Sequence, residues 1–100
     1  MPSVNISVPH ELGQETALER IQGVADKVRE KYKDQVKNME ESWEGNQLTF
    51  SFRTYGFNIK GVLEVLDAEV KLDADLPFAA MMFKGKIQES VREEFTKLLA

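Results

Sequence analysis

The chain has 100 residues, 42% of them hydrophobic and 30% charged, which is typical of a single globular domain spanning residues 1–100. It contains no cysteine and one histidine, which excludes disulfides and thiolate or histidine-rich metal sites, and we expect no metal and no other cofactor. The net charge of −4 argues against a nucleic-acid partner, because phosphate contacts require a basic excess.

No targeting signal is visible in the sequence. The first ten residues have neither the basic nor the apolar segment of a secretory signal. The longest apolar run, Leu76–Phe83, is far shorter than the roughly 20 residues that span a bilayer. We therefore expect a cytoplasmic protein without a membrane span.

Hydrophobic periodicity predicts a strand followed by a long helix. Val4, Ile6 and Val8 alternate with polar residues, and Pro9 is expected to end the pairing of this strand. A helix is predicted over Gln14–Gln35, because apolar residues recur there at intervals of three and four. They are Ala17, Leu18, Ile21, Val24, Ala25, Val28 and Tyr32.

Four strands and a closing helix are predicted next. The strands alternate between apolar and polar residues and are separated by turns at Glu44-Gly45-Asn46, at Tyr55-Gly56 and at Asp67. Gly61 falls on an inward face, where its missing side chain would let the sheet bend or a helix approach. The closing helix is predicted over Phe78–Leu99, after Pro77. Its core stripe is Ala80, Phe83, Ile87, Val91, Phe95 and Leu98.

The order β-α-β-β-β-β-α predicts an α+β fold of two layers. A curved antiparallel sheet of about five strands would have one face in solvent and the other covered by two helices. The order of the strands within the sheet stays open.

Spaced residues along nearly the whole chain resemble the polyhydroxyalkanoic acid system family of small bacterial proteins. They form three blocks and part of the closing helix: Ile6-x-Val8-x-His10-x-Leu12-Gly13 with Ala17 and Arg20-Ile21; Trp43-x-Gly45-Asn46-x-Leu48-x-Phe50; Gly61-x-Leu63-x-Val65-x-Asp67 with Val70, Leu72 and Leu76-Pro77; and Lys84 with Ile87. The resemblance implies association with the genes for synthesis and use of polyhydroxyalkanoate, the bacterial storage polyester, and a role at the storage granule. It implies no catalytic residues.

His10 and Arg20 form a candidate polar site. Imidazole exchanges protons near neutral pH, so His10 could act as a general base, and the planar guanidinium of Arg20 could bind a carboxylate or phosphate. The structural interpretation, which we favour, is that His10 bonds to backbone at the strand-to-helix junction. Arg20 would then lie along the edge of the core and reach a neighbouring carboxylate.

Trp43 is either an exposed interface anchor or a cap on the open end of the core. Asp67, Glu69, Asp73 and Asp75 could suggest a cation site, but carboxylates about 7 Å apart along a straight strand do not enclose an ion. We interpret them as a solvated face.

Phe78, Met81 and Met82 form a candidate apolar surface. At 100° per residue they lie about 180°, 120° and 140° from Ile87 on the predicted helix. Three large apolar groups on an outer face indicate a partner, a homodimer contact or an apolar ligand. The alternative is an irregular first turn that folds them under the sheet edge.

We therefore expect a non-enzymatic accessory protein of polyhydroxyalkanoate metabolism, with the granule or a granule-associated protein as partner. The alternative is a small helix-grip module that binds an acyl or hydroxyacyl ligand between sheet and helices. An enzyme that uses His10 with Arg20 or a nearby carboxylate ranks last.

Overall fold

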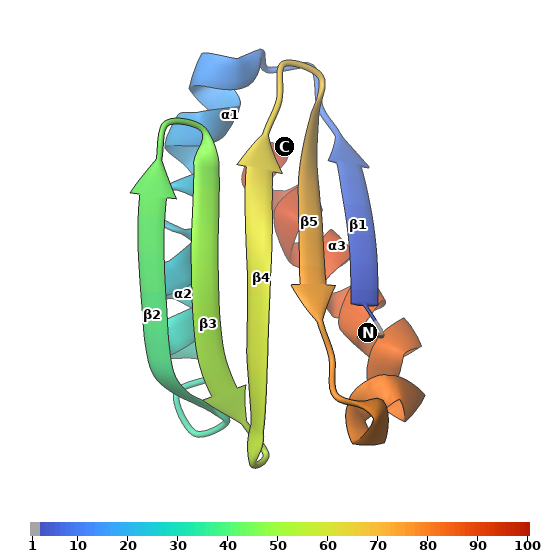
Figure 1. The fold of residues 1–100 in the computed structure, drawn as a ribbon. Coiled ribbons are helices and arrows are strands. Elements are labelled where there is room, and N and C mark those ends of the chain that lie inside the picture. The colour runs from blue at the N-terminus through green and yellow to red at the C-terminus, as the bar shows by residue number, and fades with distance from the viewer. Residues whose placement is uncertain (1–2) are drawn as a thin grey trace.

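The computed structural model describes residues 3–100, except for the side chain of Ala25. Five strands form one antiparallel sheet, and the three α-helices cover the same face of it (Figure 1). The two-layer α+β fold predicted from the sequence is confirmed. The elements are β1 (Ser3–Pro9), α1 (Gln14–Ile21), α2 (Val24–Lys31), β2 (Val36–Glu44), β3 (Gln47–Thr54), β4 (Phe57–Val65), β5 (Glu69–Asp75), the 3₁₀ helix η1 (Phe78–Phe83) and α3 (Lys84–Leu99).

The strand order is β1-β5-β4-β3-β2, so β2 to β5 form a meander and β1 pairs with its last strand. The register aligns the inward residues of all five strands in rows across the sheet. One such row runs through Ile6, Leu72, Leu63, Leu48 and Trp43. Because side chains alternate along each strand, this register buries one apolar set and exposes one polar set.

The predicted helix Gln14–Gln35 is wrong in its continuity and its end. Two eight-residue helices stand in its place, broken at Gln22 and Gly23, and the second ends at Lys31. Glycine is a poor helix former, about 1 kcal/mol worse than alanine in a helix interior. After α2 the chain turns at Tyr32 and enters β2 at Val36, because Val36 pairs with Thr54.

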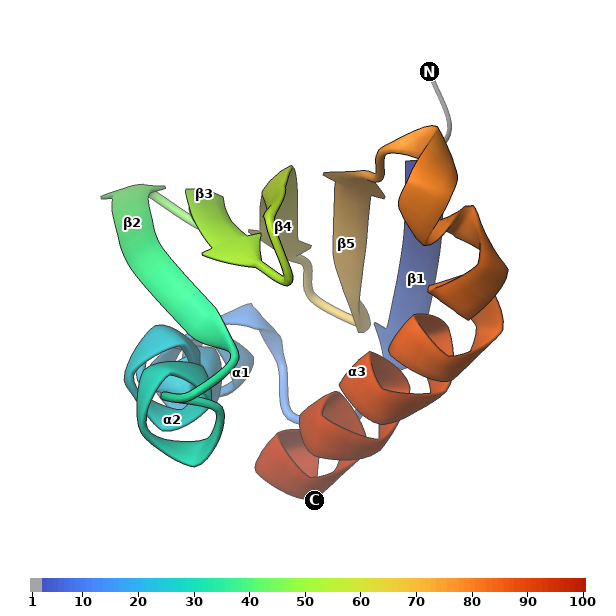
Figure 2. The ribbon, with the colours of Figure 1, turned by 90° about the horizontal axis from the view of Figure 1, so that it is seen from below.

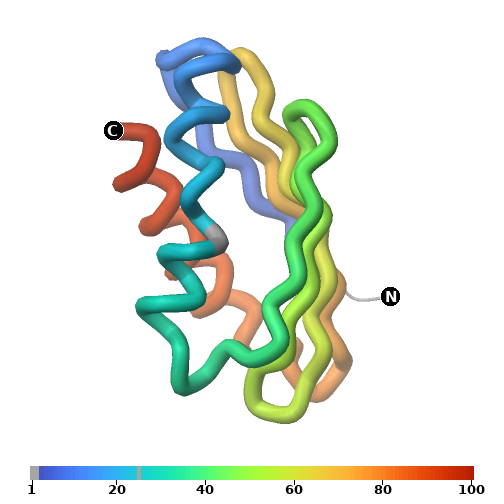
Figure 3. The backbone as a smooth tube through the Cα atoms, turned by 90° about the vertical axis from the view of Figure 1, so that its left-hand side faces the viewer, coloured from blue at the N-terminus to red at the C-terminus, as the bar shows by residue number. Residues whose placement is uncertain are grey.

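The helices divide the inner face of the sheet between them. α2 packs on β2, α1 contacts β4 and α3, and α3 lies along β1 (Figures 2 and 3). The buried core runs between these layers, with Ile21, Leu63, Val4, Val65 and Val70 as its largest fully buried side chains.

The predicted closing helix Phe78–Leu99 begins instead as η1 and becomes α-helical only at Lys84. A 3₁₀ helix turns about 120° per residue, whereas an α-helix turns about 100°. Over three residues this difference rotates Met81 by about 60° toward the sheet. Accordingly, Met81 is partly buried against the core. Phe83, predicted as a core residue, is 53% exposed where η1 meets α3, and the rotation at this position is too small to explain its exposure.

Pro9 does not end the pairing of the first strand, contrary to the sequence prediction. Pro9 lies opposite Glu69, and the N–H of His10 still donates to the carbonyl of Ala68 at 3.0 Å. Neighbouring N–H groups of a strand point to opposite sides, so the missing N–H of Pro9 faces the open edge, where proline is tolerated. The Arg92 guanidinium also donates to the Ser7 carbonyl of this strand, at 2.9 Å.

Candidate functional site

His10 links the end of β1 to the turn between β4 and β5. Its Nε2 lies 3.0 Å from the Leu66 carbonyl, and its Nδ1 accepts the N–H of Leu12 at 3.2 Å. A carbonyl oxygen can only accept a hydrogen bond, so Nε2 must carry the proton and Nδ1 must be unprotonated. Both ring nitrogens are thus engaged with backbone, which favours the structural interpretation of His10 over the general base.

The same turn supplies a cap for α1. The residue before α1 is Gly13, which has φ of 80° and no side chain to cap the helix. Asp67 replaces the missing cap, because its Oδ1 accepts the N–H of Gln14 at 3.2 Å. The side chains of Gln14 and Asn46 both donate to the Val65 carbonyl, at 3.1 and 2.7 Å. Polar residues far apart in sequence therefore fix this end of the sheet.

Arg20 lies at the last turn of α1 and donates from one guanidinium nitrogen to the backbone oxygens of Leu98 and Ala100. A cation at this position complements the partial negative charge at the C-terminal end of α3. The sequence anticipated a neighbouring carboxylate as the partner of Arg20, and backbone oxygens take that place. His10 and Arg20 share no partner among the described residues, so the structure does not join them into one polar site.

Trp43 is partly buried and packs against the core from β2. Its position opposite Leu48 places it at the end of the buried row described above. This placement agrees with the interpretation of Trp43 as a cap on the core.

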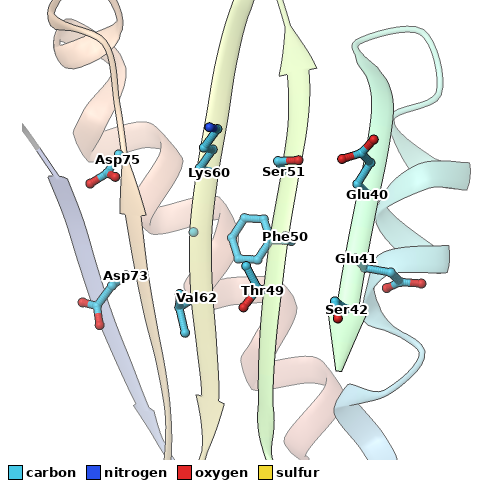
Figure 4. A pocket seen from close by; sticks show the side chains of 11 residues that line it. Glu40, Glu41, Ser42, Thr49, Phe50, Ser51, Lys60, Val62, Asp73 and Asp75 are labelled. Carbon is cyan, nitrogen blue, oxygen red and sulfur yellow. The ribbon is translucent and has the colours of Figure 1, made fainter. Parts of the chain in front are cut away.

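A shallow hollow of about 720 Å³ opens on the outer face of the sheet, away from the helices (Figure 4). Acidic and hydroxyl side chains line it, with Lys60 as its one basic residue. They include Glu40, Ser42, Thr49, Ser51, Asp73 and Asp75. Among residues 3–100, no group of three or more histidine or carboxylate side chains is placed to hold a metal ion. We interpret this hollow as part of the solvated sheet face.

The most distinctive exposed surface is apolar and lies on η1. Phe78 is 83% exposed, Met82 81% and Phe83 53%. We call these three residues the η1 patch. The sequence identified Phe78 and Met82, but it also included the partly buried Met81 and placed Phe83 in the core. Pro77 was a signal that the helix starts irregularly, yet helical periodicity alone could not show the tighter winding of η1.

No helix within residues 3–100 has the length and apolar character needed to cross a bilayer. η1 in particular has only six residues. Its exposed side chains form a local surface.

Comparisons with known proteins give one match. The model of the family described as "Putative polyhydroxyalkanoic acid system protein" matches residues 4–99. This range runs from the second residue of β1 to the last residue of α3, and it includes the turn at Asp67 and the whole η1 patch. Searches of curated proteins and of solved structures found no match.

Proposed function

We propose that this chain, which belongs to the polyhydroxyalkanoic acid system family, is a non-enzymatic accessory protein that binds the polyhydroxyalkanoate granule through the η1 patch. Family membership connects the chain with the polyhydroxyalkanoate system. The hydrogen bonds of both His10 and Arg20 go to backbone, which speaks against a catalytic role for either residue.

The exposure of the η1 patch carries this proposal. Two of its three large apolar side chains are more than four-fifths exposed, although the buried core accommodates similar residues elsewhere. Contiguous exposed apolar surface usually marks a binding site. Methionine adapts to irregular apolar partners, and an aliphatic polyester presents such a surface.

The expected binding is reversible. Full burial of a phenylalanine or methionine side chain contributes about 1.5–3 kcal/mol, and three such side chains must also offset the loss of translational freedom. We therefore expect adsorption that depends on every member of the η1 patch. Trp43 and Met81 are excluded from this surface because both pack against the core.

Co-sedimentation with lipid-free and protein-free polyhydroxyalkanoate particles tests the proposal. The wild type should pellet with the particles, and Phe78→Ser/Met82→Ser/Phe83→Ser should lower the bound fraction at least about tenfold, as loss of one to two kcal/mol per side chain implies. Phe78→Leu/Met82→Leu/Phe83→Leu is the matched control, because it keeps the patch apolar and should pellet like the wild type.

Two results would contradict direct polymer binding. One is a wild type that stays in solution with the particles, and the other is a serine variant that pellets as well as the wild type. Analytical sedimentation of the wild type and the serine variant without particles measures their oligomeric state and so tests the homodimer alternative. If the wild type dimerises and the serine variant is monomeric, while neither pellets, the η1 patch joins two copies of the chain instead.

A further inference from the structure

Basic side chains gather at the end of the molecule that carries the η1 patch. At this end β1 and β4 begin, β3 and β5 end, and η1 leads into α3 (Figure 1). The basic residues there are Lys33, Lys37, Arg53, Lys60, Lys84 and Lys86. The acidic ones include Asp34, Glu40 and Asp75, and Glu40 lies in the same cross-strand row as Lys60. We call these six basic residues together with the η1 patch the basic end.

Acidic side chains gather at the opposite end, where β4 passes to β5 and α1 begins. They include Glu11, Glu15, Glu44, Glu64, Asp67 and Glu69. Although the net charge is −4, acidic and basic side chains are distributed unequally along the long axis of the molecule, which extends 37 Å. Such a charge distribution orients a protein in an electric field.

The basic residues of this end remain available for a partner. Within residues 3–100 the ion pairs are Arg29 with Asp26, Lys31 with Glu94, Lys71 with Glu69, and Lys97 with Glu93. None of these pairs uses a residue of the basic end. Lys84 is half-buried and the other five are exposed.

A further aromatic side chain lies at the same end. Tyr55 is 78% exposed in the turn between β3 and β4, where its φ of 50° places it in the left-handed region. Its ring carries an apolar body and a polar hydroxyl, a combination suited to the boundary between water and lipid. Arg53 stands two residues before it on the outer face of β3.

We propose that the basic end binds an anionic lipid surface. Tyr55, Phe78 and Met82 would enter the apolar boundary, while lysine and arginine side chains contact the negative headgroups. The inference rests on the proposed function, because both use the η1 patch, and it adds the chemistry of the surface that this patch contacts.

The arrangement favours a lipid surface over a protein partner. The exposed apolar groups lie on two separate projections, the β3–β4 turn and η1 (Figure 1). Basic residues flank both, Arg53 before the turn and Lys84 after η1. A fluid interface adapts to such spacing, whereas a protein partner would need a matching cavity for each group. The same headgroups repel the acidic opposite end, so the long axis of the molecule would point away from the lipid surface.

Vesicle sedimentation tests this inference. Vesicles of phosphatidylglycerol and phosphatidylcholine in equal parts should bind the wild type at least about tenfold more tightly than vesicles of phosphatidylcholine alone, since each basic residue near an anionic surface contributes about a fivefold gain. Raising the salt from 0.05 to about 0.5 M should abolish most of this difference. An excess of inorganic phosphate at constant ionic strength should leave binding unchanged, and displacement by phosphate would contradict a lipid surface.

A pair of charge variants provides the control. Arg53→Glu/Lys86→Glu changes the basic end and should weaken binding to the anionic vesicles at least about tenfold. Lys71→Glu/Lys97→Glu changes the net charge equally but lies outside the basic end, and it should bind within about threefold of the wild type. Equal losses in both variants would overturn the inference, as would equal binding of the wild type to both kinds of vesicle.

The outcome is independent of the polymer experiment. A wild type that pellets with bare polymer and ignores anionic vesicles refutes the lipid inference and leaves the proposed function intact. Binding to anionic vesicles without binding to bare polymer supports the lipid inference and refutes direct polymer contact. A wild type that ignores both, but is retained by an acidic polypeptide, would assign the basic end to a protein partner and overturn the inference.

Discussion

The ring of Phe50 lies against Gly61 on the neighbouring strand, in the space that a side chain at Gly61 would occupy. The two residues are cross-strand partners in β3 and β4. A Cβ atom built on Gly61 would lie 2.5 Å from Phe50 Cζ and 2.7 Å from the Asp73 carbonyl oxygen. The sequence predicted that a helix could approach Gly61, but the ring of Phe50 makes this close contact instead. The ring covers the backbone that Gly61 leaves without a side chain.

Gly61→Ala should therefore destabilise the fold. The Asp73 carbonyl cannot move without disturbing β5, so we expect a loss of about 1–3 kcal/mol in the free energy of unfolding, as in other overpacked sites. Urea denaturation measures it. Gly85→Ala is the control, because a Cβ there meets no atom within 4 Å in the first turn of α3, and helix propensity predicts a gain of up to about 1 kcal/mol.

Two substitutions of His10 distinguish the contributions of its two hydrogen bonds to stability. His10→Ala should cost about 1–2 kcal/mol of stability, since both backbone partners lose their bond. His10→Asn keeps a short-range acceptor for the Leu12 N–H and should recover about half of that loss. Thermal denaturation of the three proteins checks the order, and an alanine variant as stable as the wild type would refute the structural role.

Most of the fold could be predicted because it depends on local alternation. The period-two pattern of β1, β3, β4 and β5 determines which side chains face inward, and the register of the sheet preserves it. In β2 the register shifts between Lys37 and Glu40. The break at Gly23 was missed, because helical periodicity shows which side chains share a face but not whether the backbone is continuous. The 3₁₀ winding of η1 was anticipated only as the alternative of an irregular first turn. This winding turned Met81 toward the core, whereas Phe83, predicted in the core, is exposed where η1 meets α3.

The sequence predicted that His10 bonds to backbone, but its distant partner Leu66 and the bond between Asp67 and Gln14 could not be predicted. These two bonds join residues more than 50 positions apart, and they depend on where β5 returns beside β1. Similarly, the basic end collects residues from five elements and one turn, so the sequence alone does not show that they lie together. The sequence pointed to Asp67 only as a turn residue.

Asp67→Ala should loosen the start of α1. Loss of an N-terminal cap costs about 0.5–2 kcal/mol, and Gly13 has no side chain to replace the carboxylate. Hydrogen exchange should accelerate for the amides of residues 14–17 and stay unchanged in α3. Asp67→Asn retains an oxygen acceptor and should exchange at nearly the wild-type rate. Uniform acceleration across the chain would argue against a local cap.

The ion pair between Lys31 and Glu94 should make the free energy of unfolding depend on pH. The hydrogen bond from Lys31 lowers the pKa of Glu94, so its stabilising effect is present above the ordinary carboxyl pKa and is lost as the pH falls through the lowered value. The same bond raises the pKa of Lys31, which preserves the pair through neutral pH. Glu94→Gln should therefore be less stable than the wild type at pH 7, and the difference in stability between the two should shrink as the pH falls below the ordinary carboxyl range.

The size of this effect should be small, because both side chains are partly exposed and solvent screens the pair. Urea midpoints at pH 7 and pH 3 provide the comparison, with Glu93→Gln as the neighbouring control. A Glu94→Gln difference that grows in acid would show that the pair does not stabilise the fold.

Oxidation of individual methionines during polymer binding tests the central claim most directly. Met82 is 81% exposed, whereas Met81 and Met39 are partly buried, so peroxide should oxidise Met82 before these two in the free protein. With polyhydroxyalkanoate particles present, the proposed function predicts at least about tenfold slower oxidation of Met82 in the pelleted protein, and an unchanged rate at Met39. Pelleted protein whose Met82 oxidises as fast as in free solution would contradict the η1 patch as the contact surface.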